Sequence, residues 1–300
     1  MQVQTLDAIT KSAFVKEQLE HVFSKVYEKK HPELKCRTHI PTDFEAGPAV
    51  ENVSFDIYED VGMAKIVAAN AGDWPRVDVV AKRHTSQVVS LGDEYAYTFQ
   101  DVRRSMATGR NLSERKAMVA KKGIMRAEDY LAYMGDSDAG QLGLLTYPTT
   151  PRILSDISIT DPTIANNIKL QRLNYWAKTP RRIAEFEVTA CLMAPSEYEF
   201  LESTARSDQS DTFLMDLFRK SNPNINFVDW CSHCEGAGIN GSNVMIFYVR
   251  DPDYVILSIP SDFEQLEPDF GGRETIISCH ERFAGIQMIQ PLSAVIVENL

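Results

Sequence analysis

Residues 111–135 read NLSERKAMVAKKGIMRAEDYLAYMG, and they carry the clearest structural signal in the chain. Apolar residues recur there at intervals of three and four positions: Ala117, Ala120, Ile124, Ala127, Leu131 and Met134. This spacing places them on one face of a helix. Asn111 and Glu114 have the spacing of a capping box, and Gly135 is a suitable helix end. The stretch therefore predicts one helix of about 23 residues, roughly 35 Å long at ~1.5 Å per residue.

Strand patterns lie on both sides of this helix. The residues from Val53 to Ile57 alternate between apolar and polar, and a second strand-like run covers 88–99. These two arms predict an extended hairpin with a turn near Trp74. After Pro180, further strand-like runs follow at 225–230, 243–249, 254–258, 274–280 and 286–298. The mixture of strands and helices predicts the α+β fold class.

Shorter helices are predicted from local signals. An amphipathic pattern covers residues 5–30. Asp161, followed by a proline, predicts the start of a helix that runs to about Lys178. Ser196 and Glu199 have the spacing of another capping box.

The composition is that of a globular protein and excludes several classes. The chain has 300 residues, of which 44% are hydrophobic and 24% are charged. Its net charge of −11 argues against a chain built as a whole to bind nucleic acid. No apolar run approaches the ~20 residues of a membrane helix, and the N-terminus lacks the pattern of a secretory signal. The five cysteines are sparse and odd in number, so we expect reduced thiols in a protein made in the cytoplasm.

Two motifs could carry metal or redox chemistry. Cys231-Ser232-His233-Cys234 has the spacing of half a zinc site, and Cys279 with His280 could supply the rest. The same pair of cysteines also permits a redox interpretation. No second Cys-x-x-Cys or His pair lies nearby in the sequence, so plain thiols are the favoured interpretation.

Two further motifs fail on their context. Residues 236–241 match the dinucleotide-binding glycine pattern, but a strand-like run follows them where a helix is needed. A surface loop is the better interpretation. Residues 136–138 begin like a calcium loop, but Gly140 and Tyr147 occupy positions that need acidic ligands. We therefore expect no cofactor, no metal and no catalytic residue.

Residues 40–148 resemble the phage major capsid proteins of the Hong Kong 97-type fold, and most closely a branch known only as a conserved phage family of unknown function. The blocks that carry the resemblance are DIYEDVGMAKI at 56–66, PRVDV at 75–79, YAYTFQDVR at 95–103, RK at 115–116 and GDSDAGQLGLL at 135–145. The order and spacing of these blocks are specific together, although no block is specific alone.

The resemblance implies a domain organisation. The expected parts are an N-terminal arm at 1–40, a peripheral domain at 41–52, 95–185 and 270–300, an extended loop at 53–94 and an axial domain at 186–269. The helix at 112–134 becomes the spine of the peripheral domain. The extended loop is expected to reach over a neighbouring subunit.

The resemblance also implies a function and partners. Copies of the chain would form pentamers and hexamers of an icosahedral shell, the virion capsid, around double-stranded DNA. That DNA would be bound by non-specific contact, with no enzyme activity and no membrane. Portal and decoration proteins are further partners that the family admits. The alternatives are an encapsulin-type nanocompartment shell and, from a different class, a cytoplasmic zinc or redox enzyme using Cys231, Cys234 and Cys279.

Two sets of site residues follow from this interpretation. The candidates for subunit contacts are Lys65, Trp74 and Arg76, all on the extended loop. Residues 101–128 hold eight basic and three acidic residues, against the acidic charge of the whole chain. The candidates for a basic helix that faces either the shell interior or another subunit are Arg115, Lys116, Lys121, Lys122 and Arg126.

Overall fold

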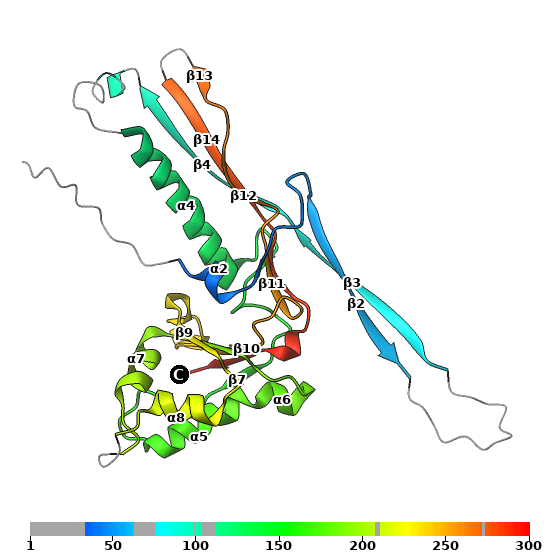
Figure 1. The fold of residues 1–300 in the computed structure, drawn as a ribbon, viewed down its shortest axis with the longest axis vertical. Helices are drawn as coiled ribbons and strands as arrows, with labels where there is room; N and C mark the ends of the chain where they lie inside the picture. The colour runs from blue at the N-terminus through cyan, green and yellow to red at the C-terminus, as the bar shows by residue number, and fades with distance from the viewer. Residues whose placement is uncertain are drawn as a thin grey trace, which may run out of the picture. The chain divides into compact units, whose positions relative to one another are not determined.

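The computed structural model describes residues 34–62, 76–98, 112–207, 211–271 and 274–300, together with residues 100, 101 and 103. All of them belong to one compact unit, Leu34–Leu300. The helix expected at 5–30 lies outside the described residues. Within them, helices and strands mix along the chain, as Figure 1 shows. The predicted α+β class is confirmed.

The longest described helix is α4 (Leu112–Met134), as the sequence predicts. Its apolar stripe faces inward, because Ile124 is only 2% exposed and Ala120 is also buried. Gly135 ends the helix with a φ of +68°, and a Cβ there would lie 2.5 Å from the carbonyl oxygen of Gln141. Glycine is therefore required at this helix end.

Helix α4 lies along a long antiparallel sheet (Figure 1), and its apolar stripe packs against that sheet. In this sheet β4 (Val89–Thr98) pairs with β14 (Glu274–Phe283) over the whole length of both strands. β12 (Ser261–Gln265) and β13 (Asp269–Gly271) pair with the other edge of β14. Ala120 and Ile124 meet Cys279 of β14 in a small apolar cluster.

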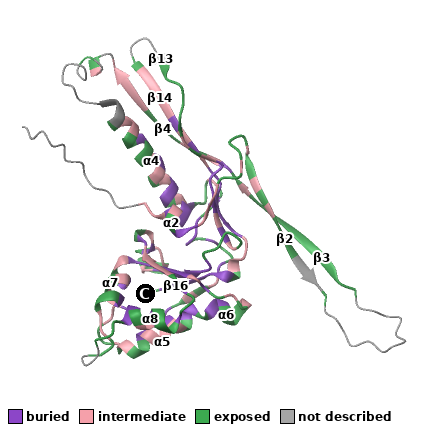
Figure 2. Ribbon diagram, viewed as in Figure 1, coloured by how far each residue is buried: buried purple, intermediate pink, exposed green. Residues whose placement is uncertain are grey.

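A second sheet separates the two larger cores. Its strand order is β7 (Arg152–Leu154), β16 (Val295–Glu298), β10 (Met245–Tyr248), β8 (Ala190–Met193) and β9 (Phe227–Trp230). Every residue of β8, β10 and β16 is buried (Figure 2). Ile246 and Tyr248 join one core, whereas Met245 and Phe247 join the other. Burial on both faces explains why these strands read as continuous apolar runs.

Helices cover one face of this second sheet. They are α5 (Asn166–Ala177), α6 (Thr179–Ala184), α7 (Pro195–Ser203) and α8 (Leu214–Ser221). Leu173, Leu201 and Phe218 of these helices enter one core. The other core includes a three-stranded sheet of β1 (Thr42–Asp43), β11 (Val255–Ser258) and β15 (Gly285–Met288). The run expected at 286–298 therefore divides into two strands, β15 and β16.

A separate antiparallel hairpin consists of β2 (Asn52–Val61) and β3 (Asp78–Gln87). The extended hairpin is confirmed, but the prediction of its second arm is wrong. The run at 88–99 is β4, which pairs with β14 instead. The boundary expected after residue 94, between the extended loop and the peripheral domain, falls inside β4. The hairpin itself ends at Gln87. Alternation identifies a strand but not its partner, which is why the sequence misplaced this arm.

Two local expectations also differ from the structure. The helix expected from Asp161 begins at Asn166, because the Asp161 carboxylate accepts hydrogen bonds from the amide and hydroxyl of Thr163 and forms a turn instead. Ser196 lies within α7, and its hydroxyl donates to Glu197, so no capping box forms.

Candidate functional site

The β2–β3 hairpin exposes apolar side chains along its length. Every residue of β3 except Ser86 is exposed. Val77 is 74% exposed and Tyr58 is 67% exposed, and Val79 is exposed as well. Figure 2 colours most of the hairpin as exposed. Exposed apolar groups gathered in this way mark an interaction surface.

Facing side chains, not a core, hold the two strands of the hairpin together. Phe55 stacks on His84 with ring centroids 5.4 Å apart. The Arg83 guanidinium donates to the Asp56 carboxylate at 2.7 and 2.9 Å and lowers the pKa of Asp56. Such cross-strand pairs favour one register of the two strands, but a two-stranded hairpin alone is marginally stable in water. The hairpin therefore keeps its register but lacks a surface to pack on within the described part of the chain.

Of the three candidates for subunit contacts, Arg76 is the one that lies within the described residues. Arg76 is exposed just before β3. Lys65 and Trp74 lie outside the described residues.

The five basic candidates on α4 divide into two groups. The Lys116 ammonium donates to the Ala96 carbonyl at 2.5 Å, lies 4.7 Å from the centre of the Tyr97 ring and is 3.8 Å from Asp101. Lys121 lies 5.5 Å from the centre of the Phe263 ring. These lysines therefore bind the chain's own sheet.

The remaining basic candidates on α4 are more exposed to solvent. Arg115 and Arg126 are exposed and form no ion pair with any residue that the structure describes, whereas Lys122 is exposed and has a contact of its own. Arg115 also lines a shallow pocket of about 280 Å³ beside β4. The two arginines are thus the α4 cations best placed to meet a partner.

An ion cluster that the sequence analysis missed joins α2 (Cys36–His39) to the α4 layer. Arg37 donates to Glu128 of α4 at 2.7 and 2.8 Å, to Asp262 of β12 at 2.9 Å and to Glu281 of β14 at 3.4 Å. Glu128 and Glu281 are both buried. Burial, and then the charge of Glu128, raise the pKa of Glu281 to about 8. Arg37 bridges the buried acids Glu128 and Glu281 and in this way holds α2 against α4 and the long sheet.

The same short segment is also tied to the second sheet. The Asp129 carboxylate accepts hydrogen bonds from the amides of Lys35 and Cys36 at 3.1 and 3.0 Å. The Lys35 ammonium reaches Asp229 of β9 at 2.9 Å, and Arg250 donates to the His39 carbonyl. Residues 35–39 therefore connect both layers of the unit.

The cysteines of the sequence motifs do not come together. Cys231 and Cys234 belong to the core of the second and third sheets, whereas Cys279 packs under α4. The zinc interpretation thus loses its third ligand. Among the described residues, no group of three or more His, Cys, Asp or Glu side chains could hold a metal ion. The glycine-rich residues 236–241 form a mostly exposed loop, and β10 follows them where a phosphate-binding helix would be needed.

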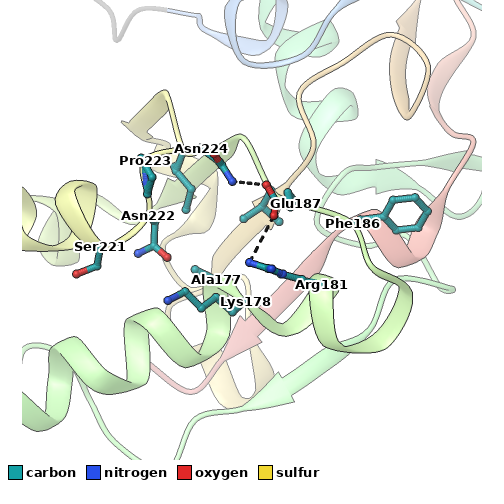
Figure 3. A pocket seen from close by; sticks show the side chains of 11 residues that line it. Ala177, Lys178, Arg181, Phe186, Glu187, Ser221, Asn222, Pro223 and Asn224 are labelled. Carbon is teal, nitrogen blue, oxygen red and sulfur yellow. Dashed lines mark hydrogen bonds and ion pairs between the residues drawn. The ribbon is translucent and has the colours of Figure 1, made fainter.

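A pocket of about 210 Å³ lies between α6 and the turn after α8 (Figure 3). Its polar groups already satisfy one another: Arg181 pairs with Glu187 at 3.4 Å, and the Asn224 amide also donates to Glu187. The Asn222 amide donates to Asn174. This arrangement offers a ligand few unpaired groups.

The sequence model of the Major capsid protein family matches residues 62–299. The chain belongs to this family. The match includes α4, both edges of the long sheet and the whole second sheet. As a major capsid protein, the chain is a structural component that assembles with copies of itself into a phage shell.

Solved capsids share the fold. The chain is similar to the capsid of Myoviridae phage XM1, with a TM-score of 0.83 and 15% identity over 95% of this chain and 98% of that one. For the capsid of the cyanophage P-SCSP1u the TM-score is 0.64 at 12% identity, over 95% and 94% of the chains. A virus-like particle from Pyrococcus furiosus gives a TM-score of 0.54 at 14% identity, over 87% and 91%. The expected Hong Kong 97-type fold is confirmed.

Two negative findings accompany these matches. No curated protein matches the chain. No helix among the described residues is long and apolar enough to cross a membrane.

Proposed function

We propose that the chain builds the icosahedral shell, made of pentamers and hexamers, that encloses the double-stranded DNA of a tailed phage. The observation that carries this proposal is the family match over residues 62–299. The role is structural and not catalytic, the chain is made in the host cytoplasm, and it resides in the virion. Portal and decoration proteins are partners that such a shell admits, and no described surface is assigned to them.

The proposed domains follow the two sheets. The peripheral domain takes α4 with β4, β12 and β14, because these elements share one apolar cluster, and also β13, which pairs with β14. β12 and the first residue of β13 fall within the range 186–269 expected for the axial domain, so their assignment changes. The axial domain, expected at 186–269, takes β8, β9 and β10 of the second sheet together with α7 and α8. The boundary between hairpin and peripheral domain is placed at Gln87, where pairing with β2 ends.

The hairpin is proposed to lie on a neighbouring copy of the chain. Its exposed valines and Tyr58 would be covered there, which removes apolar surface from water. Each subunit would give one hairpin and receive another. Such reciprocal contacts hold together once a shell closes, because no subunit can leave without breaking several at once.

Arg115 and Arg126, the exposed arginines of α4, are proposed to face the packaged DNA. Contact with phosphate needs position and positive charge but no sequence code. Arg115→Glu with Arg126→Glu should leave empty shells intact and shorten the packaged DNA, measured separately by electron microscopy and by gel. Lys220→Glu, an exposed charge reversal on α8, is the matched control. Loss of shells in the double variant alone would assign these arginines to subunit contacts instead.

The contents of purified shells test the proposal against a nanocompartment. Particles from infected cells should hold DNA that resists nuclease until the shells are opened. Shells filled with a cargo protein and free of nuclease-resistant DNA would contradict the proposed function.

A further inference from the structure

The proposed shell function does not explain one feature of the sequence, the Cys231-Ser232-His233-Cys234 motif. Cys231 follows β9 directly, and the 3-10 turn η1 (Ser232–Cys234) carries the chain to the second cysteine. The Cys234 amide donates to the Cys231 carbonyl at 3.1 Å. A turn closed in this way brings its first and fourth Cα atoms within about 7 Å. A disulfide needs about 4.4–6.8 Å, so the backbone is already near that separation.

The pair lies at the end of a β-α-β unit. β8 and β9 are parallel and are joined through α7 and α8. The Cys231 amide donates to the Met193 carbonyl of β8 at 2.9 Å, and the Val244 amide donates to the Cys234 carbonyl at 2.9 Å. Both ends of the motif are therefore fixed by the sheet. A Cys-x-x-Cys beside a β-α-β unit is the arrangement of dithiol redox sites.

The surroundings shift the pKa values of the two thiols in opposite directions. The neighbouring Cys234 side chain, as a hydrogen-bond partner, lowers the pKa of Cys231 against the effect of burial, and the nearby His39 lowers it further. The same hydrogen bond and burial raise the pKa of Cys234 well above its usual value. A thiolate is the nucleophile in thiol chemistry. Cys231 is thus suited to attack, and Cys234 to keep its proton until a later step.

Nearby charged groups support this asymmetry. His233 meets the Asp129 carboxylate at 2.8 Å, and this contact, followed by the charge of Cys231, raises the pKa of His233 against the effect of burial. The His233 ring also stacks on Tyr133 with centroids 5.1 Å apart, which holds it in place. A protonated His233 places positive charge beside a Cys231 thiolate.

Burial decides which oxidants can reach the pair. Cys231 is only 4% exposed, and Cys234 is not exposed at all. A protein disulfide or glutathione is too large to approach either sulfur without unfolding the loop. Hydrogen peroxide is little larger than water and carries no charge. Between the two cysteines, Ser232 is exposed and the side chain of His233 is one quarter exposed, so the turn itself faces solvent.

We propose that Cys231 and Cys234 form a peroxide-reactive dithiol that closes to a disulfide within each shell subunit. The Cys231 thiolate attacks one peroxide oxygen, the O–O bond breaks, and the departing hydroxide takes up a proton to become water. The sulfur is now a sulfenic acid. The Cys234 sulfur attacks it, the S–S bond forms, the S–O bond breaks, and the thiol proton leaves with the hydroxide as a second water. In total the dithiol loses two hydrogen atoms and one peroxide becomes two waters.

The remaining cysteines lack this arrangement. Burial raises the pKa of Cys36, of Cys191 and of Cys279, so none of them is a ready nucleophile. In a reducing cytoplasm the pair would stay reduced, and outside the cell it would oxidise. That timing rests on the proposed function, but the chemistry of the pair does not.

The test is peroxide treatment of the folded full chain, followed by denaturation, alkylation of free thiols and mass spectrometry of the tryptic digest. The peptide 221–250 holds both Cys231 and Cys234 and no other cysteine. It should become two hydrogen masses lighter and resist alkylation, while the other three cysteines remain alkylated. Cys234→Ser should stop at a sulfenic acid on Cys231, trapped by a 1,3-dione. Cys191→Ser is the matched control and should still form the disulfide.

The pH dependence gives a second readout. Below its pKa, an ordinary thiol reacts about tenfold faster for each unit by which the pH rises, whereas the loss of the Cys231 thiol should change far less between pH 6 and pH 8. Five alkylated cysteines after a dose that oxidises free cysteine would overturn the proposal. So would oxidation spread evenly over all five. Because these readouts concern single chains, they remain decisive even if no shell forms.

Discussion

Truncation of Tyr58 on the β2–β3 hairpin separates assembly from folding. Tyr58 is 67% exposed on the single chain. A fully buried aromatic side chain removes about 150–250 Å² from water, so roughly 100–170 Å² of Tyr58 remains for a neighbour to cover. At about 25 cal/mol per Å² this covering contributes roughly 2.5–4 kcal/mol per subunit. Alanine keeps part of that surface, so we expect Tyr58→Ala to cost about 2 kcal/mol of each contact.

That cost should appear in the protein concentration at which shells form. Because about 1.4 kcal/mol is a factor of ten, the threshold should rise about 30-fold, as measured by light scattering over a dilution series. The unfolding free energy of the unassembled subunit should change by less than about 0.5 kcal/mol. Tyr58→Phe keeps the aromatic area and is the matched control. Equal losses of subunit stability and assembly in Tyr58→Ala would mean that the side chain packs within its own chain, and the reasoning would be refuted.

Two further predictions concern the α4 layer. Because the pKa of Glu281 is raised to about 8, the folded state keeps a proton that the unfolded state releases near pH 4.5, so this group lowers stability as pH rises between those values. Glu281→Gln, which keeps the neutral form, should therefore be more stable than the parent chain by on the order of 1 kcal/mol at pH 9 and unchanged at pH 4, in urea unfolding, while the exposed Glu264→Gln shows no such difference. Ile124→Ala should cost about 2–5 kcal/mol in the same assay, against less than about 0.5 kcal/mol for Val119→Ala on the exposed face; similar losses in both would contradict the placement of the stripe.

The parts of the fold that the sequence predicts are those with long, regular patterns. The α4 helix is predicted to within a residue, because its apolar residues repeat through six turns and a glycine ends it. Strands β9, β10 and β16 of the second sheet are predicted, because burial leaves apolar runs such as Met245–Tyr248, whereas β7 and β8 are missed. The order of the strands in the sheet is not predicted, since pairing is set by contacts far along the chain.

Short signals and distant contacts explain the failures. Asp161 caps a turn and not a helix, because its carboxylate satisfies the nearby Thr163 instead. The cluster of Arg37 with Glu128 and Glu281 escaped prediction because its members lie far apart in sequence and each looks like ordinary surface charge. The one signal in the sequence that could have singled out Glu281 is its position as an acidic residue within an otherwise strand-like run.

The functional motifs divide in the same way. The ordered blocks between residues 56 and 145 predicted the family, which the match over residues 62–299 confirms. The chemistry of the Cys231 motif could not be judged from spacing alone, because it depends on the turn and on the side chains that the fold places around it.

Electron microscopy of the purified chain, with its mass measured by sedimentation, tests the central claim most directly. If this chain is the shell subunit, concentrated protein should form closed shells or rings of five and six subunits. A protein that sediments as a compact monomer at every concentration and salt would contradict the account.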